Sequence, residues 1–183
     1  MIQTLKYPPE WKRIRRFGRG VKYTLPIKDF TNQLQELAEG TKGLLLYRQV
    51  ALTPWTYERK QSYIQYLLMG GVDGRSIFFN CKNWNYGQGS GHLQIVDGLE
   101  RVTALLQFLD NDIAIFGEWL YDDFKDTLTA TKSDYRLDVY VNDLNTDTES
   151  CEWCWNLNGF SRSVEDLQEI WKWRNYYANR NGG

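Results

Sequence analysis

The chain has few of the residues that export, membrane insertion or histidine-based metal chemistry require. Its 183 residues include only three cysteines and one histidine. No run of 18 apolar residues occurs, which excludes a spanning helix of ordinary length. The first residues also lack the apolar core and small-residue cleavage site of a secretory signal. Because an odd cysteine count gives no sign of a disulfide framework, we expect a reducing, cytoplasmic setting and no membrane contact.

Apolar and aromatic residues, in contrast, are abundant enough to build a core. Hydrophobic residues make up 42% of the chain and aromatic residues 15%, which rules out a disordered chain. The length suits one ordinary domain. No internal repeat, low-complexity tract or long linker divides the sequence. Helical and strand patterns of mixed order predict a single α+β domain.

The net charge of −1 conceals a strongly basic N-terminal segment. Residues 6–22 carry a net charge of +6, so the rest of the chain carries −7. The cations are Lys6, Lys12, Arg13, Arg15, Arg16, Arg19 and Lys22, opposed only by Glu10. Two interpretations stand: a solvated segment, or an arm that binds a polyanion such as double-stranded DNA through Lys12, Arg13, Arg15, Arg16 and Arg19. We expect residues 1–26 to form an irregular basic arm and residues 27–183 to form the domain.

Periodicity places the secondary structure of that domain. Helical spacing occurs in 28–39, 57–69, 99–109, 148–156 and 164–178. Strand patterns occur in 43–48, 76–79, 93–96, 113–116 and 135–141. Residues 117–133 are acidic and weakly patterned.

The segment Asp97-Gly98-Leu99-Glu100-Arg101 joins a predicted strand to a predicted helix. The first amides of a helix have no internal partners and carry partial positive charge, so this turn is suited to a phosphate. Gly98 permits a sharp turn and close approach, and Arg101 can reach back to offer two donors to phosphate oxygens. Asp97 could hold a divalent ion, and Glu100 could act as general base for an attacking water. The alternative is purely structural, with Asp97 as N-cap and Glu100 completing a capping box.

Several separated motifs resemble the N-terminal domain of GmrSD-type, modification-dependent restriction systems, which has a ParB/sulfiredoxin-like fold. The similarity begins at Leu46-Tyr47-Arg48-Gln49 and Pro54-Trp55. It continues through 96–105, which is similar to the family's Asp-Gly-Gln-Gln-Arg-Leu-Thr, and through 137–141 and 157–159. It spans roughly 44–173.

The resemblance implies nucleotide binding and hydrolysis at the matching positions Asp97, Gly98, Arg101 and Thr103. It also implies a nucleotide-facing role for Arg48 and Gln49, whose order is reversed from the family's. Leu99 and Glu100 replace both glutamines, which removes amides that could orient a nucleotide or water. The family's larger members carry a histidine-metal nuclease domain, and with a single histidine we do not expect this sequence to act as such a nuclease.

Other chemistry-bearing residues have structural alternatives. His92 precedes the strand that leads to Asp97, so it could face the same site or be a surface residue. Cys151 and Cys154 form a Cys-x-x-Cys pair for which core packing is favoured over zinc or redox chemistry. Asp122, Asp123 and Asp126 could bind a cation, although an acidic, solvated loop is favoured.

We therefore expect a phosphate- or nucleotide-binding domain related to bacterial restriction and phage–host conflict. Its expected ligands are an NTP and Mg²⁺, and its expected activity, if it is an enzyme, is weak NTP hydrolysis. The alternative is a non-catalytic module that binds DNA or a protein partner and retains the fold.

Overall fold

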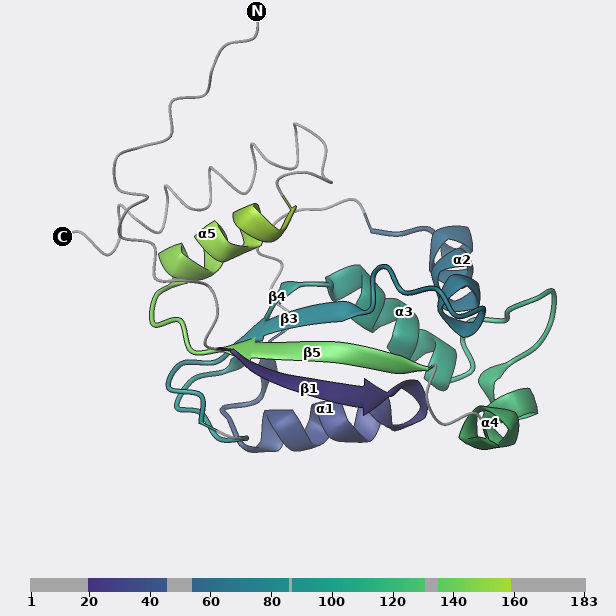
Figure 1. Cartoon of the computed structure of the whole chain (residues 1–183), viewed down its shortest axis with the longest axis horizontal. Helices are drawn as coiled ribbons and strands as arrows, with labels where there is room; N and C mark the ends of the chain where they lie inside the picture. Colours follow the sequence, from purple (N-terminus) through teal and green to yellow (C-terminus); the bar gives the residue numbers. More distant parts are fainter. Residues whose placement is uncertain (1–19, 46–53, 86, 131–134, 159–183) are drawn as a thin grey trace, which may run out of the picture.

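A five-stranded mixed sheet with the strand order β1-β5-β3-β4-β2 lies at the centre of the computed structural model (Figure 1). The structure describes residues 20–45, 54–85, 87–130 and 135–158. The strands are β1 (Val21–Pro26), β2 (Leu44–Leu45), β3 (Ser76–Asn80), β4 (Leu93–Asp97) and β5 (Arg136–Asn142). β5 runs parallel to β3, and β4 runs parallel to β2, whereas the β1–β5 and β3–β4 pairs are antiparallel. The chain is thus a single α+β domain.

Helices cover both faces of this sheet. They are α1 (Phe30–Glu39), preceded by the 3-10 turn η2 (Ile27–Asp29), α2 (Tyr57–Leu68), α3 (Leu99–Leu109), α4 (Tyr121–Ala130) and α5 (Asp147–Asn158). α5 lies on the opposite side of the sheet from α1 (Figure 1). Among the described residues, no helix is long and apolar enough to cross a membrane.

The main core lies between the sheet and α1, α2 and α3. Leu137, Val139 and Val141 of β5 alternate toward it and are fully buried, as their spacing predicts. Phe30 of α1 and Leu105 of α3 are buried in the same cluster. A smaller cluster on the other face contains Val96, Trp153 and Cys154 and holds α5 against β4.

The predicted N-terminal boundary at residue 26 is wrong. Residues 21–26, expected as the end of an irregular arm, form β1, which pairs along its whole length with β5. One of the seven cations, Lys22, belongs to this strand. Its Nζ lies 2.9 Å from Asp138 Oδ2 of β5. Alternating Val21, Tyr23 and Leu25 carry the strand signal, which the flanking charges obscured.

The predicted strand at 113–116 is also wrong. Ile115 makes only an isolated bridge to Trp119, although Ile113 and Ile115 are buried. α2 holds this loop, because Gln61 donates to the carbonyl of Ala114 and the Ala114 amide donates to the Tyr57 hydroxyl. A buried loop can therefore show the alternation of a strand. The helix α4 follows where the sequence showed only a weak pattern.

Candidate functional site

The predicted strand–turn–helix at Asp97 to Arg101 is present. β4 ends at Asp97, which pairs across the ladder with Phe78, and α3 begins at Leu99. Gly98 is the N-cap of α3 and has φ of +104°, a left-handed conformation that a residue with a Cβ adopts only with strain. The capping-box interpretation is corrected, because the cap residue is Gly98 rather than Asp97 and no side chain caps the helix. The polar side chains of this turn consequently have other partners.

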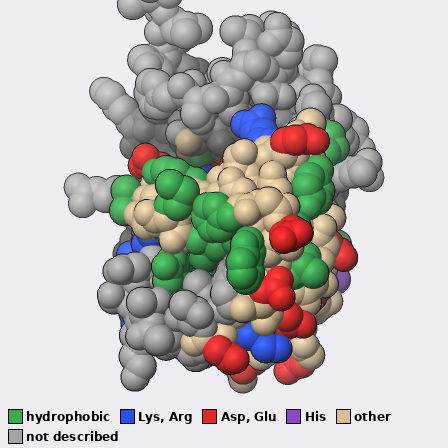
Figure 2. All heavy atoms as spheres, turned by 90° about the vertical axis from the view of Figure 1, so that its right-hand side faces the viewer, with side chains coloured by type: hydrophobic (Ala, Val, Ile, Leu, Met, Phe, Trp, Pro, Cys, Tyr) green, Lys and Arg blue, Asp and Glu red, His purple; other side chains and the backbone are tan. Residues whose placement is uncertain are grey.

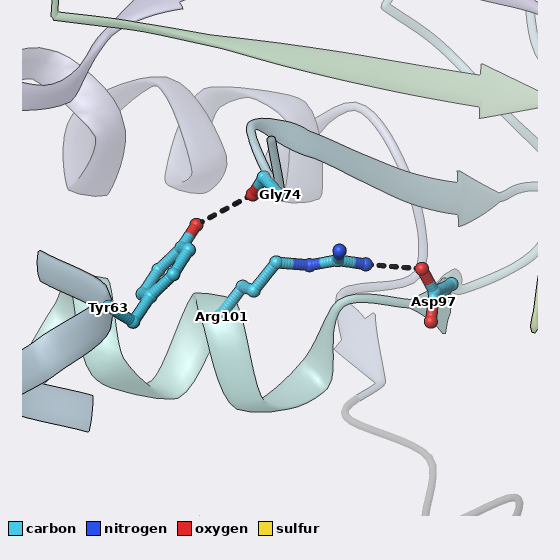
Figure 3. A network of polar contacts seen from close by, with 4 residues as sticks. All are labelled: Tyr63, Gly74, Asp97 and Arg101. Atoms are coloured by element: carbon cyan, nitrogen blue, oxygen red, sulfur yellow. Dashed lines mark hydrogen bonds and ion pairs between the residues drawn. The ribbon is translucent and has the colours of Figure 1, made fainter. Parts of the chain in front are cut away.

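Arg101 and Asp97 form an ion pair that spans the turn. Nη2 of Arg101 donates to Oδ2 of Asp97, one helical turn earlier (Figure 3). The Arg101 side chain is 20% exposed and the Asp97 side chain 10%. Their attraction is therefore screened less than that of the surface pairs of this chain.

Gly98 makes room for the guanidinium of Arg101. A Cβ at position 98 would lie 3.2 Å from Arg101 Nε and 3.3 Å from Nη2. Nε itself is buried and has no hydrogen-bond partner among the described residues. Arg101 thus lies across the beginning of its own helix, with one donor satisfied by Asp97 and another buried donor unsatisfied.

Tyr63 of α2 lies beside the aliphatic part of Arg101. Its hydroxyl donates to the Gly74 carbonyl over 2.9 Å, just before β3 (Figure 3). Burial raises the pKa of Tyr63 well above its usual range, although the charges of Arg101 and Arg75 act in the opposite direction. The hydroxyl therefore stays protonated at neutral pH and serves as a fixed donor that ties α2 to the start of β3.

Glu100 is tied to the N-terminal end of α2. Its Oε2 accepts a hydrogen bond from the backbone N–H of Trp55 over 2.9 Å. Trp55 in turn packs edge-on against Tyr63, with ring centroids 5.3 Å apart, and Arg59 lies over the Trp55 ring. The side chain predicted as a general base thus connects α3 to the segment before α2, an arrangement that gives it a structural task.

Thr103 is also engaged within its own helix, because its hydroxyl donates to the Leu99 carbonyl over 2.9 Å. This back-bond points the hydroxyl along the helix and occupies the group that the resemblance assigned to a nucleotide. The oxygen keeps acceptor capacity only.

The other predicted ligands are not brought to this turn by the described structure. His92 is exposed and precedes β4, whereas Asp97 ends it, so the two lie roughly 16 Å apart along the strand. Arg48 and Gln49 lie outside the described residues, as do Lys12, Arg13, Arg15, Arg16 and Arg19. Their predicted contacts with nucleotide and DNA remain predictions.

The donor set at the turn does not form a metal site by itself. Within the described part of the chain, no three His, Cys, Asp or Glu side chains gather as metal ligands. Asp97 is the single carboxylate at the turn that the sequence assigned to a metal, and it is already paired with Arg101. Oxygen-rich coordination of Mg²⁺ would have to come mainly from a bound phosphate and water.

The cysteines are buried, as the core interpretation predicts. Cys81, Cys151 and Cys154 are at most 4% exposed, and none forms a disulfide. Burial, with the nearby carboxylates of Asp147 and Glu152, raises the pKa of Cys151 to about 11. A buried thiol that resists ionisation is inert in redox chemistry.

Comparison of the chain with known protein families, curated proteins and solved structures finds no match. The site therefore rests on its own geometry. Sequence reasoning missed Trp55, Tyr63 and Gly74 as neighbours of the turn. Tyr63 falls within the helix predicted at 57–69, and only the packing of α2 against α3 shows that its side chain lies beside Arg101.

Proposed function

We propose that this chain is a phosphate- or nucleotide-binding domain of the ParB-like, restriction-related kind, which binds its ligand at the start of α3 without hydrolysing it. The observation that carries the proposal is the guanidinium of Arg101. It lies across the left-handed Gly98 at a helix N-terminus, and its buried Nε has no hydrogen-bond partner within the described part of the chain. A buried charged donor without an acceptor is costly, so an anion that supplied one would be bound favourably.

In this proposal, the carboxylate of Asp97 takes the place on Arg101 that a phosphate oxygen would take. It neutralises Arg101 as a phosphate would, with one negative charge and one accepted hydrogen bond. An incoming phosphate offers more oxygens, which the guanidinium fork and the first amides of α3 can share. Binding thus amounts to exchange of one anion for another on Arg101, and Asp97 competes with the ligand.

Two contacts argue against turnover. Glu100 Oε2 holds the amide of Trp55, and the hydroxyl of Thr103 donates to its own helix. A general base must be free to reach a water beside the ligand. The function best supported is therefore binding. The fold family, the identity of the nucleotide and a need for Mg²⁺ belong to this proposal as expectations from the resemblance.

Calorimetric titration with ATP, GTP and CTP, with Mg²⁺ and with a chelator, tests the proposal. We expect wild type to bind at least one nucleotide and Arg101→Lys to bind it on the order of tenfold more weakly, because lysine keeps the charge and loses the fork. Arg59→Lys is the matched control, since Arg59 lies over Trp55 at the surface and should leave affinity unchanged. No binding by folded wild type would overturn the proposal.

A further inference from the structure

A short hairpin between α3 and α4 holds an aromatic side chain in an unfavourable backbone conformation. Ile115 and Trp119 exchange two backbone hydrogen bonds, of 2.8 and 3.0 Å, around the loop of residues 116–118. Phe116 has φ of +48°, in the left-handed region that bulky residues rarely adopt, and Gly117 follows with φ of +104°. Observed strain of this kind points to a role for the residue that stability alone does not explain.

The hairpin presents its aromatic residues to solvent from a fixed base. Phe116 is 52% exposed, Trp119 53% and Tyr57 of α2 47%. The base is anchored, because Ile113 and Ile115 are buried and the Tyr57 hydroxyl accepts from the Ala114 amide. We call Tyr57, Phe116 and Trp119 the aromatic tip. Hydrophobic side chains gather on the face that contains α2 and α4, with acidic side chains beside them (Figure 2).

Acidic residues surround the aromatic tip in the sequence. Residues 110–126 contain six carboxylates and one lysine, a net charge of −5. All six are exposed, and Lys125 is already paired with Asp122 over 3.0 Å. We call them the acidic rim: Asp110, Asp112, Glu118, Asp122, Asp123 and Asp126. This charge repels nucleic acid and favours a cationic polypeptide, whose arginines can stack on exposed rings.

The chain itself contains a segment of matching chemistry. Residues 6–19 carry six cations against Glu10, a net charge of +5, and are interleaved with Tyr7, Trp11 and Phe17. We propose that the aromatic tip and acidic rim bind this basic segment of a second copy of the chain. Opposite charges would guide the encounter, and aromatic anchors would supply the desolvated contacts.

Distances along the fold favour a second copy over the same chain. The segment joins the domain at Gly20, beside Val141, whereas η2 and α4 lie at the other end of β1. Six residues of strand separate the two ends, roughly 20 Å. Arg19 is directly bonded to Gly20, so its backbone and side chain together span well under that distance, and it cannot meet the acidic rim of its own chain. The rim of a second copy is not subject to this limit.

The contact is head-to-tail, because the segment joins the domain at Gly20 and the acidic rim lies toward the other end of β1. Such a contact joins copies in series unless the rotation closes a ring. It would also use the cations that the sequence assigns to DNA, so association and DNA binding would exclude one another. This inference does not depend on phosphate binding at Arg101, which lies at a different turn.

Sedimentation of full-length variants tests the contact. One variant, Phe116→Gly/Trp119→Ser, alters the tip and keeps the basic segment. The other, Arg13→Glu/Arg15→Glu/Arg16→Glu, alters the segment and keeps the tip. We expect wild type to associate with rising concentration at about 50 mM NaCl and to dissociate at about 0.5 M. Each variant alone should be monomeric, and an equimolar mixture should form a 1:1 complex, because one intact interface remains between them.

Val72→Ser is the matched control, since Val72 is 71% exposed on another part of the surface and should not affect association. Circular dichroism confirms that each variant folds; glycine also suits the backbone of position 116, so the tip variant should remain stable. The proposal is overturned if wild type stays monomeric at low salt. It is equally overturned if the tip variant associates with itself as wild type does, or if the two variants do not combine.

Discussion

Arg101 donates a hydrogen bond to Asp97 across a single left-handed residue, Gly98, so that the ion pair closes over the N-terminus of its own helix. Both side chains are largely buried, and Nε of the guanidinium has no hydrogen-bond partner in the regions that the structure describes. The pair thus joins β4 to α3, and in our proposal its guanidinium also binds a phosphate. These two roles make different predictions.

The ion pair between Arg101 and Asp97 should contribute measurably to the free energy of unfolding. Asp97→Asn weakens a largely buried ion pair, and Arg101→Ala leaves the Asp97 carboxylate without its cation, so each should lower the free energy of unfolding by about 1–3 kcal/mol. The double variant should lose less than the sum of the two, since the interaction can be lost only once. Asp122→Asn, which breaks an exposed pair with Lys125, should lower the free energy of unfolding far less than either change in the buried pair. Urea denaturation measures all four; additive losses would contradict a direct interaction.

Gly98 should be more sensitive to substitution than a glycine of similar backbone conformation in open space. Gly98→Ala adds a Cβ within 3.3 Å of the guanidinium at φ of +104°, whereas Gly70→Ala at φ of +88° meets nothing within 4 Å. Both should lose about 1–2 kcal/mol to backbone strain, and Gly98→Ala should lose more. The excess should disappear when Arg101→Ala is the background. An equal loss at both glycines would show that Arg101 does not depend on the missing Cβ.

Glu100 should behave as a structural acceptor rather than as a base. Glu100→Gln keeps an oxygen for the Trp55 amide and should change stability little, whereas Glu100→Ala should lose about 1 kcal/mol. If Glu100 were a general base, Glu100→Gln would abolish nucleotide hydrolysis while leaving stability intact. A colorimetric phosphate-release assay beside thermal unfolding separates the two outcomes.

The buried thiols should react slowly with thiol reagents, and Cys151 should make the stability of the chain fall at alkaline pH. We expect no cysteine to react quickly with Ellman's reagent in the folded chain and all three to react in guanidinium chloride. The pKa of Cys151 is raised from 9.0 to about 11, so the folded state retains a proton that the unfolded state releases. The raised pKa of Cys151 therefore makes its full contribution to the free energy of unfolding below about pH 9, and this contribution is lost as the pH rises toward 11. Cys151→Ala should flatten the fall in stability over that window; an unchanged slope would contradict it.

Local patterns predicted most of the elements and the turn itself. The helices at α1, α2 and α3 and the strands at β3, β4 and β5 follow from periodicity and from glycine at the ends. β1 was missed because the basic residues that precede it obscured its apolar alternation. The pattern at 113–116 gave a wrong strand because these residues form a loop that packs against α2.

The partners within the site were beyond local reasoning. That Glu100 would hold Trp55, or that Tyr63 would face Arg101, depends on how α2 packs against α3. Glu100 and Trp55 are 45 positions apart in the sequence, too far for local patterns to predict their contact. Helix type and register can be inferred from a short window of sequence, whereas a contact over that separation is decided by the tertiary fold.

Titration of inorganic pyrophosphate into wild type, Asp97→Asn and Arg101→Lys, without added metal, tests the central claim most directly. If Asp97 competes with a phosphate for Arg101, Asp97→Asn should bind on the order of tenfold more tightly than wild type, because the loss of one charged acceptor frees the guanidinium. Arg101→Lys should bind more weakly than either. An Asp97→Asn variant that is folded yet binds pyrophosphate no better than wild type would contradict the account.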